Sequence, residues 1–486
     1  MPLRPPPRRE QSWLLPPTLE ELIPADHPAR FAAAFVDAFD RATWAELDVE
    51  MEGDVLGAPA YHPRVLLAVW VYGFMGGVRS SRKLEGACRD QVPYLWLTGW
   101  QQPDHNTLWR FYRAHRQQMR KLLKRTVRTA VRLNLVDLAV QAVDGTKVAA
   151  NAAKEHTYDA KGLQGLLART EAAIRDLEAQ NETAGDAPPP HLPEVLAHKQ
   201  ALREQVQRAL VEVEAEDGPA RLNLTDADAE LMKSRQGFVA GYNAQAMVSP
   251  LNEGTAGRTG LLITAAEVVT DPDDHGQLLP MCEAAEAITG QRADVTLADG
   301  GYYSGPNLVA CAEREQTIVV PEARTGAYHK NAFTYDAEAD SYTCPHGQVL
   351  RLVGSKRRGH RPATRVYRGA AAVCRTCPAF GRCTTDRRHG RMLEVGPEEA
   401  HLQRHRRWMA TEAARVAYRQ RKQVVEPSFG ILKEQQGARR FLLRGLTNVR
   451  AEWSLLATAF NLRTLAKIWQ QLVGGRQKLV AGGVMG

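Results

Sequence analysis

The alternation of apolar and polar residues predicts a β-strand that carries an aspartate to its end. Apolar residues occupy alternate positions from Val136 onward, and Asp144 and Gly145 follow them. A period of two is typical of a strand, and a glycine lets the backbone turn after it. A second apolar run repeats the order of strand, aspartate and glycine around Asp299. Two strands that each end in a carboxylate are the pattern around which we interpret the rest of the chain.

Elsewhere apolar residues recur every three or four positions, which predicts helices. This spacing dominates residues 13–135, interpreted as an all-α N-terminal domain, and residues 161–234, interpreted as an antiparallel helical hairpin. In the first of these segments, Asp104 or Asn106 is the predicted N-cap of a strongly basic helix over residues 107–131. The hairpin contains no motif with chemistry, so we interpret it as a spacer or a dimer contact.

The segments on either side of the hairpin predict an α/β catalytic core of the RNase H-like class with a mixed sheet. They contain three strands, a helix, a strand, a helix and a strand, which is the element order of that fold. Such a core places two strand-borne carboxylates side by side at the centre of the sheet. The predicted boundaries are a disordered arm 1–12, the helical domain 13–135, the core 136–160 and 235–325, the hairpin 161–234, a cysteine-rich insertion 326–400, a C-terminal catalytic helix and basic region 401–472, and a disordered tail 473–486.

Positive charge is concentrated in two windows of the chain. The whole chain has a net charge of +8 (63 Lys and Arg minus 55 Asp and Glu). Residues 101–135 contain nine Lys and Arg against one acid, and residues 401–450 contain twelve against three, a local net charge of +9. Aromatic residues are interleaved in both windows. This pattern favours a nucleic-acid-binding surface over the simpler alternative of solvated helix faces.

Composition indicates a soluble, globular, intracellular protein. Hydrophobic residues make up 44% of the chain and charged residues 24%. No apolar run approaches the roughly 20 residues that a bilayer-spanning helix needs, and the Pro- and Arg-rich start lacks the apolar region of a secretory signal. We therefore expect a cytoplasmic, nucleoid-associated protein without a membrane partner.

Four of the seven cysteines lie in the predicted insertion and suggest a metal site. Cys344 is followed at a distance by Cys374, Cys377 and Cys383, of which the first two form a C-x2-C pair. Thiolates at this spacing can bind one tetrahedral Zn²⁺ ion, and an intracellular chain disfavours disulfides. His346 is a competing ligand. A structural zinc is the favoured interpretation, with a metal-free cysteine cluster as the alternative.

A glutamate in the second basic window supplies a third acid. Residues 402–426 predict a helix that carries Glu426 near its end, and Pro427 is expected to kink or restart it. Tyr418, Lys422 and Glu426 are four residues apart and so share one helical face. A cation beside a carboxylate depresses its pKa and keeps it ionised. Two strand-end aspartates and a helical glutamate are the components of a two-metal site for phosphoryl transfer.

Short motifs distributed over nearly the whole chain point to one family. They are YHPRVLLAVWVYGFMGGVRSSRKLE, PDHNTLWRFY, VDGTKVAANA around Asp144, GYNAQAMV, ADGGYYS around Asp299, C-x2-CP, and Y-x2-RK-x2-VEPSFG-x2-K around Glu426. With these motifs the chain resembles the DDE transposases of bacterial insertion sequences, and most of all the group numbered eleven-eighty-two. The wider family places three residues between the motif arginine and the glutamate. Four separate Arg421 from Glu426 here, so either Arg421 or Lys422 takes the arginine's role.

The resemblance implies an enzyme that binds terminal inverted repeats and catalyses DNA nicking and strand transfer. Asp144, Asp299 and Glu426 would bind two Mg²⁺ (or Mn²⁺) ions. Double-stranded DNA, both element ends and target, would be the partner of a homodimer or higher oligomer. The residues expected to contact DNA are Tyr418, Arg421, Lys422 and Lys433 near the scissile bond, and Arg110 and Arg113 in the N-terminal basic helix. The alternatives are a non-catalytic DNA-binding remnant and a structure-specific nuclease of the same fold.

Overall fold

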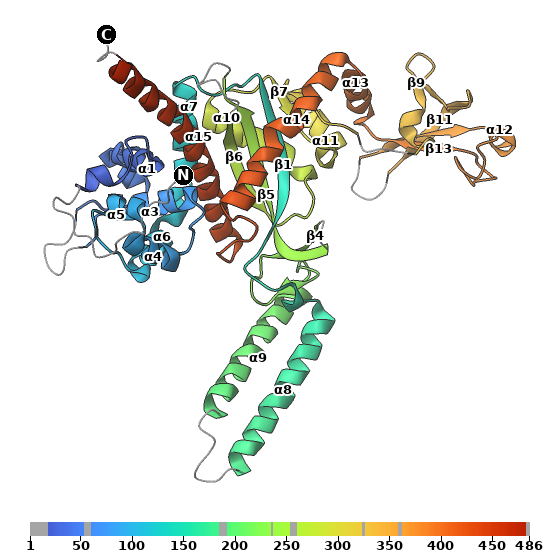
Figure 1. Ribbon diagram of the computed structural model, residues 1–486. Coiled ribbons are helices and arrows are strands. Elements are labelled where there is room, and N and C mark those ends of the chain that lie inside the picture. The colour runs from blue at the N-terminus through green and yellow to red at the C-terminus, as the bar shows by residue number, and fades with distance from the viewer. Residues whose placement is uncertain are drawn as a thin grey trace, which may run out of the picture.

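The protein is a mixed α/β structure with two projections. The computed structural model describes residues 18–52, 60–183, 192–234, 237–252, 260–322, 326–357 and 362–482. A central sheet is flanked by helices, and a helical hairpin and a smaller sheet extend from it in different directions (Figure 1). The predicted arm over residues 1–12 lies outside the described residues.

The central sheet has the strand order β6-β5-β1-β7-β8, with β4 pairing β5 beyond the end of β6. Its strands are β1 (Val140–Ala149), β4 (Glu230–Ser234), β5 (Gly237–Pro250), β6 (Leu261–Val269), β7 (Val295–Leu297) and β8 (Thr317–Val319). β1 is antiparallel to β5 and parallel to β7, and β7 is parallel to β8. β5 is antiparallel to β4 and β6. The result is a mixed sheet with β1 at its centre.

β1 extends past the aspartate at which we expected it to end. The strand continues beyond Asp144, and the residues that follow stay paired with β5. Gly145 therefore lies within the strand, and the turn predicted there is wrong. A Cβ atom at Gly145 would collide with side-chain atoms of Gln245 and Asp274. The glycine is required by the close approach of these side chains, not by a change of chain direction.

Among the described residues before 133, all regular secondary structure is helical. The helices longer than one turn are α1 (Pro28–Asp37), α2 (Arg41–Glu46), α3 (Pro63–Met75), α4 (Ser81–Asp90), α5 (Val92–Thr98), α6 (His105–Met119) and α7 (Lys121–Arg132). The single basic helix predicted over residues 107–131 is thus divided into α6 and α7. Asp104 is the N-cap of α6, because its Oδ1 accepts hydrogen bonds from the backbone N–H groups of Asn106 (2.8 Å) and Thr107 (2.9 Å). One of the two predicted caps is confirmed.

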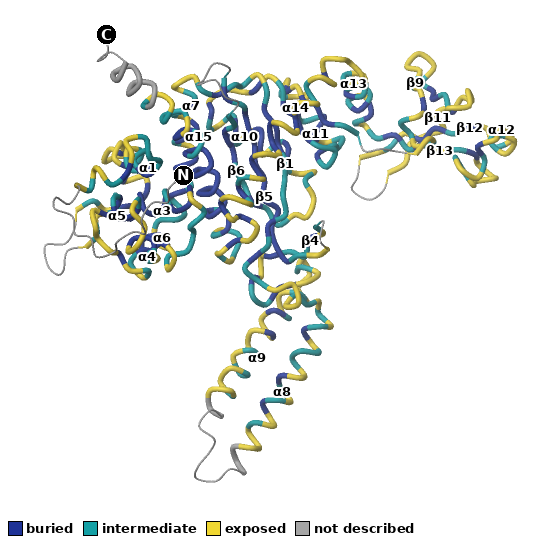
Figure 2. Tube along the Cα trace, viewed as in Figure 1, coloured by how far each residue is buried: buried dark blue, intermediate teal, exposed yellow. Residues whose placement is uncertain are grey.

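The long helix α15 (Leu446–Gly482) joins the N-terminal helices to the sheet. It packs against α3, α6 and α7 on one side and β6 on the other. A continuous core contains Trp70 from α3, Val127 from α7 and Trp453 from α15, and Figure 2 shows this region as buried. The predicted tail from residue 473 is helical as far as Gly482, and residues 483–486 lie outside the described part.

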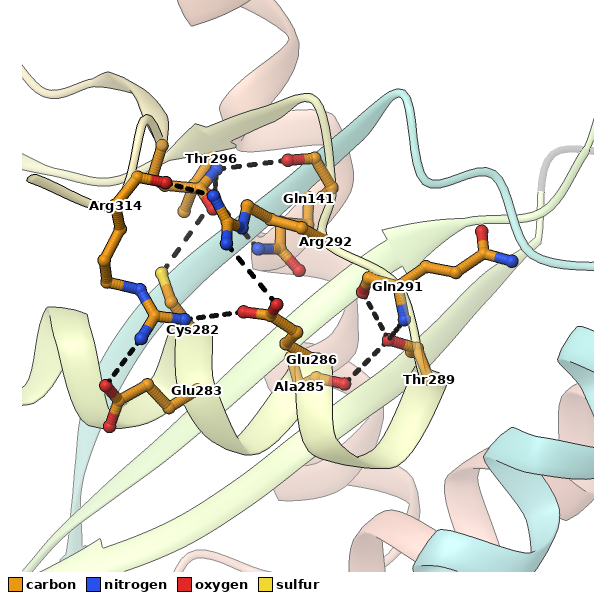
Figure 3. Close-up of polar contacts among 12 residues, drawn as sticks. Gln141, Cys282, Glu283, Ala285, Glu286, Thr289, Gln291, Arg292, Thr296 and Arg314 are labelled. Atoms are coloured by element: carbon orange, nitrogen blue, oxygen red, sulfur yellow. Dashed lines mark hydrogen bonds and ion pairs between the residues drawn. The ribbon is translucent and has the colours of Figure 1, made fainter. Parts of the chain in front are cut away.

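Helices cover both faces of the central sheet. Besides α15, they are α10 (Leu278–Thr289), α11 (Gly305–Glu313), α13 (Glu399–Met409) and α14 (Glu412–Gly430). α10 and α11 share a buried cluster with Val143 and Met247 of the sheet. Arg314, just after α11, bonds with Glu283 (2.8 Å) and Glu286 (2.6 Å) of α10, which ties these two helices together (Figure 3). α14 runs through Pro427 to Gly430 before a π-helical turn, so the restart expected at the proline is wrong.

The two projections are built differently. α8 (Ala160–Thr183) and α9 (Leu192–Glu214) lie side by side as a hairpin whose surface is largely exposed (Figure 2). A two-residue strand pair, β2 (Thr157–Tyr158) and β3 (Leu222–Asn223), closes its base. The smaller sheet is antiparallel with the order β13-β12-β11-β10-β9 and carries the short helix α12. Its elements are β9 (Thr334–Asp336), β10 (Ser341–Thr343), β11 (Val349–Lys356), β12 (Thr364–Gly369), α12 (Ala371–Thr376) and β13 (Met392–Val395).

Candidate active site

The pairing of β1 with β7 brings Asp144 and Asp299 together. Ala142 pairs with Leu297, an offset of 155 residues (297 minus 142), and the same offset places Asp299 beside Asp144. β7 ends before Asp299, which caps a short 3₁₀ helix by accepting a hydrogen bond from Gly301 N (2.8 Å). β1 continues past this point. The two carboxylates therefore lie where β7 leaves the sheet and exposes the side of β1.

Arg421 of α14 joins the two aspartates. Its Nη2 atom lies 2.9 Å from Asp144 Oδ2 and 3.8 Å from Asp299 Oδ2. The Arg421 side chain is only 8% exposed, whereas Lys422 is exposed. Of the two basic residues left open by the sequence, Arg421 is the one that contacts the aspartates. Its charge offsets part of the negative charge that the two carboxylates bring into a mostly buried site.

Asp144 is held in an environment that disfavours its ionised form. Burial, the largest cause, raises the pKa of Asp144 to about 6, against the lowering effect of Arg421, and the charge of Asp299 raises it further. A cation bound beside Asp144 would favour its ionised form.

Two more residues of the third-acid motif lie at the same site. The Lys433 ammonium donates a hydrogen bond to Thr146 Oγ1, two positions after Asp144 on the same face of β1. Tyr418 is half-buried. Burial raises the pKa of its hydroxyl, and the charges of Arg421, Asp299 and Asp144 also act on it. Tyr418, Arg421 and Lys433 thus surround the two aspartates.

Glu426 lies apart from this group. It is exposed on α14, whereas Arg421, Val424 and Val425 are buried against the sheet. On a helix with about 3.6 residues per turn, the five positions from Arg421 to Glu426 correspond to a rotation of about 140°. Within the described part of the chain, no set of three or more His, Cys, Asp or Glu side chains is arranged so that it could hold a metal ion. The structure brings two of the three predicted acids together.

A polar network that the sequence analysis missed lies on the other face of β1. Asp274 Oδ1 accepts hydrogen bonds from Asn243 Nδ2 (2.7 Å) and Gln245 Nε2 (2.7 Å), and the Lys147 ammonium lies 3.8 Å away. The Tyr302 hydroxyl donates to Gln245 Oε1. The two amides were visible as polar residues in the motif GYNAQ, where an apolar strand is otherwise expected. Nothing local in the sequence pointed to Asp274.

Two segments of the chain match known transposase families. Residues 343–466 match the family described as Transposase DDE domain, and residues 17–114 match the family described as Transposase domain (DUF772). The two matches indicate a DDE transposase of the insertion-sequence type. The matches do not resolve the group to which its insertion sequence belongs. A comparison with curated proteins found no match.

The two matched segments contain different candidate site residues. The DDE domain segment includes α14, with Arg421 and Glu426, and the four cysteines of the smaller sheet. The N-terminal segment includes Arg110 and Arg113. Asp144 and Asp299 lie between the two matches, so their proximity to Arg421 links the unmatched sheet to the matched helix. Among the residues that the structure describes, we found no helix long and apolar enough to cross a membrane.

The aspartate pair fits a divalent cation in its donor atoms. Carboxylate oxygens are the ligands that Mg²⁺ and Mn²⁺ prefer, and a bound cation would favour the ionised form of Asp144, which burial disfavours. Glu426, the third predicted acid, is exposed and lies apart from the pair. The donor atoms are therefore of the kind that a divalent metal prefers, but only two of the three predicted acids lie together.

The cysteines of the transposase share one cavity. Cys344, Cys374, Cys377 and Cys383 are free thiols that line a cavity of about 50 Å³, together with His346. Three of the sulfur atoms accept backbone N–H groups, at 3.3 Å for Cys344, 3.4 Å for Cys374 and 3.5 Å for Cys377. Burial raises the pKa of the Cys383 thiol. The insertion thus gathers the predicted ligands around one cavity, but its described residues contain no arrangement that could hold a metal ion as it stands.

The predicted DNA-reading residues of α6 point away from the core. Arg110 and Arg113 are both exposed. Their helix is held on α15, where Arg116 Nη2 donates to Asn448 Oδ1 (2.8 Å) and Gln117 Nε2 donates to Thr447 O (3.2 Å). α6 therefore presents two cations from a helix whose opposite side is fixed to the core.

The raised pKa of Asp144 predicts a pH-dependent effect on stability. A carboxyl group whose pKa is higher in the folded protein costs stability as pH rises through the window from its unfolded value, near 4, to its folded value, about 6. Asp144→Asn, which stays neutral, should therefore gain stability relative to the wild type between about pH 4 and pH 7, by up to about 3 kcal/mol. Urea unfolding in EDTA measures the difference. Asp137→Asn, on a half-buried residue before β1, is the matched control. A constant difference between Asp144→Asn and the wild type at both pH values would contradict the account of this site.

Proposed function

We propose that this chain is the transposase that moves an insertion sequence. It binds the element's terminal inverted repeats, nicks the DNA there and transfers the freed strand to target DNA at a single active site. The observation that carries the proposal is the cluster in which Arg421, from the segment matched to the DDE domain, joins Asp144 and Asp299. DNA is the substrate that the family implies.

The central sheet supports an RNase H-like core. Its elements follow one another as β1, β5, β6, α10, β7, α11 and β8, interrupted by the hairpin and by β4. This is the order of three strands, a helix, a strand, a helix and a strand expected from the sequence. The paired aspartates lie on its central strand and on the end of the neighbouring one, as the proposed catalytic role requires.

Asp144, Asp299 and Glu426 would hold two Mg²⁺ or Mn²⁺ ions. When bound, such ions activate a water or a DNA 3′-hydroxyl for attack and stabilise the leaving 3′-oxygen. Arg421 keeps the two aspartates together and partly neutralised. Because Glu426 lies outside the cluster, we propose that its approach is the step of assembly that DNA and cation binding promote. A site that is completed only on DNA would protect other phosphodiesters from cleavage.

The cations around the aspartates would position the DNA. Arg421 and Lys433 flank Asp144, and Tyr418 lies beside them with a hydroxyl able to bond with phosphate. Lys422 is exposed on the same helix and available to the backbone. Arg110 and Arg113 on α6 would contact the repeat itself. These assignments divide the DNA contacts between the reacting phosphate and the recognised sequence.

The cysteine cluster supports a structural zinc site. We propose that Cys344, Cys374, Cys377 and Cys383 bind one Zn²⁺ after a small closure of their shared cavity, with His346 as the competing ligand. Sulfur atoms that already accept backbone N–H groups are prepared to carry the negative charge of thiolate ligands.

Metal analysis tests this site. Protein purified without chelators should contain about one Zn²⁺ per chain, and Cys377→Ser should lose it and unfold more easily. Cys282→Ser changes a buried cysteine of α10 and should leave the zinc content unchanged. Wild-type protein without zinc would leave a metal-free cysteine cluster.

Nicking of labelled DNA tests the proposed function. Purified protein should cut a duplex that carries the element end at the boundary of the inverted repeat, in Mg²⁺ but not in EDTA. Binding of the end without any nick would favour the non-catalytic remnant. Cleavage of branched DNA without preference for the repeat would favour the structure-specific nuclease.

A further inference from the structure

Helix α7 has a buried apolar face and an opposite face that is rich in cations. The apolar face, which includes Leu122 and Val127, is buried in the core. The helix contains no acidic residue. The cations on the other face are Lys121, Lys124, Arg125, Arg128 and Arg132.

These five side chains line a groove of about 740 Å³ between α7 and the end of α10. Ile288, Thr289 and Gly290 form the opposite wall, and Glu46 is the one acidic residue among the described side chains that line it. The α10 wall is fixed in place, because the Thr289 hydroxyl donates to Ala285 O (2.8 Å) and accepts from Gln291 N (3.4 Å) (Figure 3). The groove is therefore a built feature of the packing between the two helices.

The positive charge of the groove is only partly offset by nearby acids, which are Glu46 in its lining and Asp40 beside Arg125. Lys121 donates to Glu46 O (2.7 Å), Arg125 to Thr43 Oγ1 (2.7 Å) and Arg128 to Ile288 O (3.3 Å), and all three acceptors are uncharged. Throughout the described part of the chain, none of the five cations forms an ion pair with a carboxylate. Like charges four residues apart on a helix destabilise it. A polyanion in the groove would remove this repulsion.

We propose that this groove binds the phosphate backbone of duplex DNA, at a place separate from the catalytic aspartates. The cationic row from residue 121 to residue 132 extends about 16 Å, over which one strand of B-DNA presents about five phosphates. Five of the ten residues that line the groove are cations, beside the apolar residues Val131 and Ile288, whereas the centre of a protein–protein interface is depleted in charged residues. The inference rests on the proposed function only in taking DNA as the substrate.

The distance of the groove from the catalytic aspartates indicates which part of the DNA it would hold. Asp274, near the catalytic aspartates, lies just before α10, and the groove is formed by the last residues of α10. The length of that helix separates the two places by about 17 Å. Phosphates held in the groove would therefore belong to DNA outside the scissile position, and their contacts would hold the duplex without reading its sequence.

A salt titration of DNA binding tests the proposal. The variant Lys124→Gln/Arg132→Gln removes two exposed charges, and among the described residues neither side chain forms a hydrogen bond with another helix. Binding of a random-sequence duplex and of an element-end duplex is measured by fluorescence anisotropy in EDTA, so that no cleavage occurs. The plot of log K against log salt concentration should become shallower by about 1.8, or about 0.9 for each phosphate that is no longer neutralised, on both DNAs alike.

The control variant Arg169→Gln/Arg175→Gln removes the same charge from the exposed side of α8 and should leave the slope unchanged. An unchanged slope in the groove variant, with an unfolding curve like that of the wild type, would overturn the inference. Equal reductions of the slope in both variants would also overturn it, because they would show a general effect of net charge. If the protein binds DNA through the groove but never nicks it, the proposed function is wrong and the inference about the groove still holds.

Discussion

Asp144→Asn, Asp299→Asn and Glu426→Gln should each slow Mg²⁺-dependent nicking by at least about 100-fold, since several kcal/mol of transition-state charge stabilisation would be lost. A neutral amide is a poor ligand for a hard cation. Binding of the element end should stay within a few-fold of the wild type, because none of these residues contributes positive charge to the DNA. Single-turnover cleavage of a labelled end duplex, with anisotropy for binding, measures both effects.

The three acids should differ in how much they affect the stability of the protein without DNA. Asp144 and Asp299 pair with Arg421, whereas Glu426 is exposed, so Glu426→Gln should leave the unfolding curve unchanged while it abolishes nicking. Asp274→Asn is the matched control, because it removes a nearby carboxylate from the opposite face of β1. It should retain nicking within about tenfold of the wild type. Full activity of Glu426→Gln together with an inactive Asp274→Asn would assign the third acid to Asp274.

Arg79→Met should lower the free energy of unfolding by about 3–5 kcal/mol. Arg79 and Glu452 form an ion pair of 2.6 Å in which the side chains are 6% and 2% exposed. Glu452 also accepts the backbone N–H groups of Leu442 (3.0 Å) and Leu443 (3.0 Å). The pair thus joins the chain after α3 to α15 and to the loop before it. Removing the cation would leave a buried carboxylate without its partner, and urea unfolding measures the cost.

A double variant separates the ion pair from simple loss of packing. Arg79→Met/Glu452→Gln should be more stable than Arg79→Met, because the uncompensated charge is gone. The exposed pair of Arg439 and Glu434, with side chains 68% and 59% exposed, is the control, and Arg439→Met should leave the unfolding curve nearly unchanged. A double variant less stable than Arg79→Met would show that the two side chains stabilise the protein by packing and not by their charges.

The sequence predicted the parts of the site that depend on local pattern. Each aspartate follows an apolar run in the sequence, which marks it as a residue near the end of a strand. The parallel pairing of β1 and β7 then places Asp144 and Asp299 together. The spacing of apolar residues predicted the helices, and the chemistry of Asp104 predicted a helix start. In each case the information lies within a few residues of the position that it determines.

Other features depend on contacts between distant residues and left no local signal. Gly145 looked like a turn residue, but it is small because side chains of β5 and of the segment before α10 approach it. Asp274 precedes a helix in a stretch rich in aspartates, and only the fold shows that two buried amides hold it. The rotation of α14 decides that Arg421, and not Glu426, faces the aspartates. Helical periodicity gives relative positions on a helix but not the face that packs.

Strand transfer by the purified protein tests the central claim most directly. A pre-cut element end with a free 3′-hydroxyl and a labelled strand is mixed with a circular plasmid in Mg²⁺, and covalently joined products are resolved on a denaturing gel. We predict joining by the wild type, none in EDTA and none with Asp299→Asn. A protein that nicks DNA and binds the ends but never joins them to the plasmid would contradict the account.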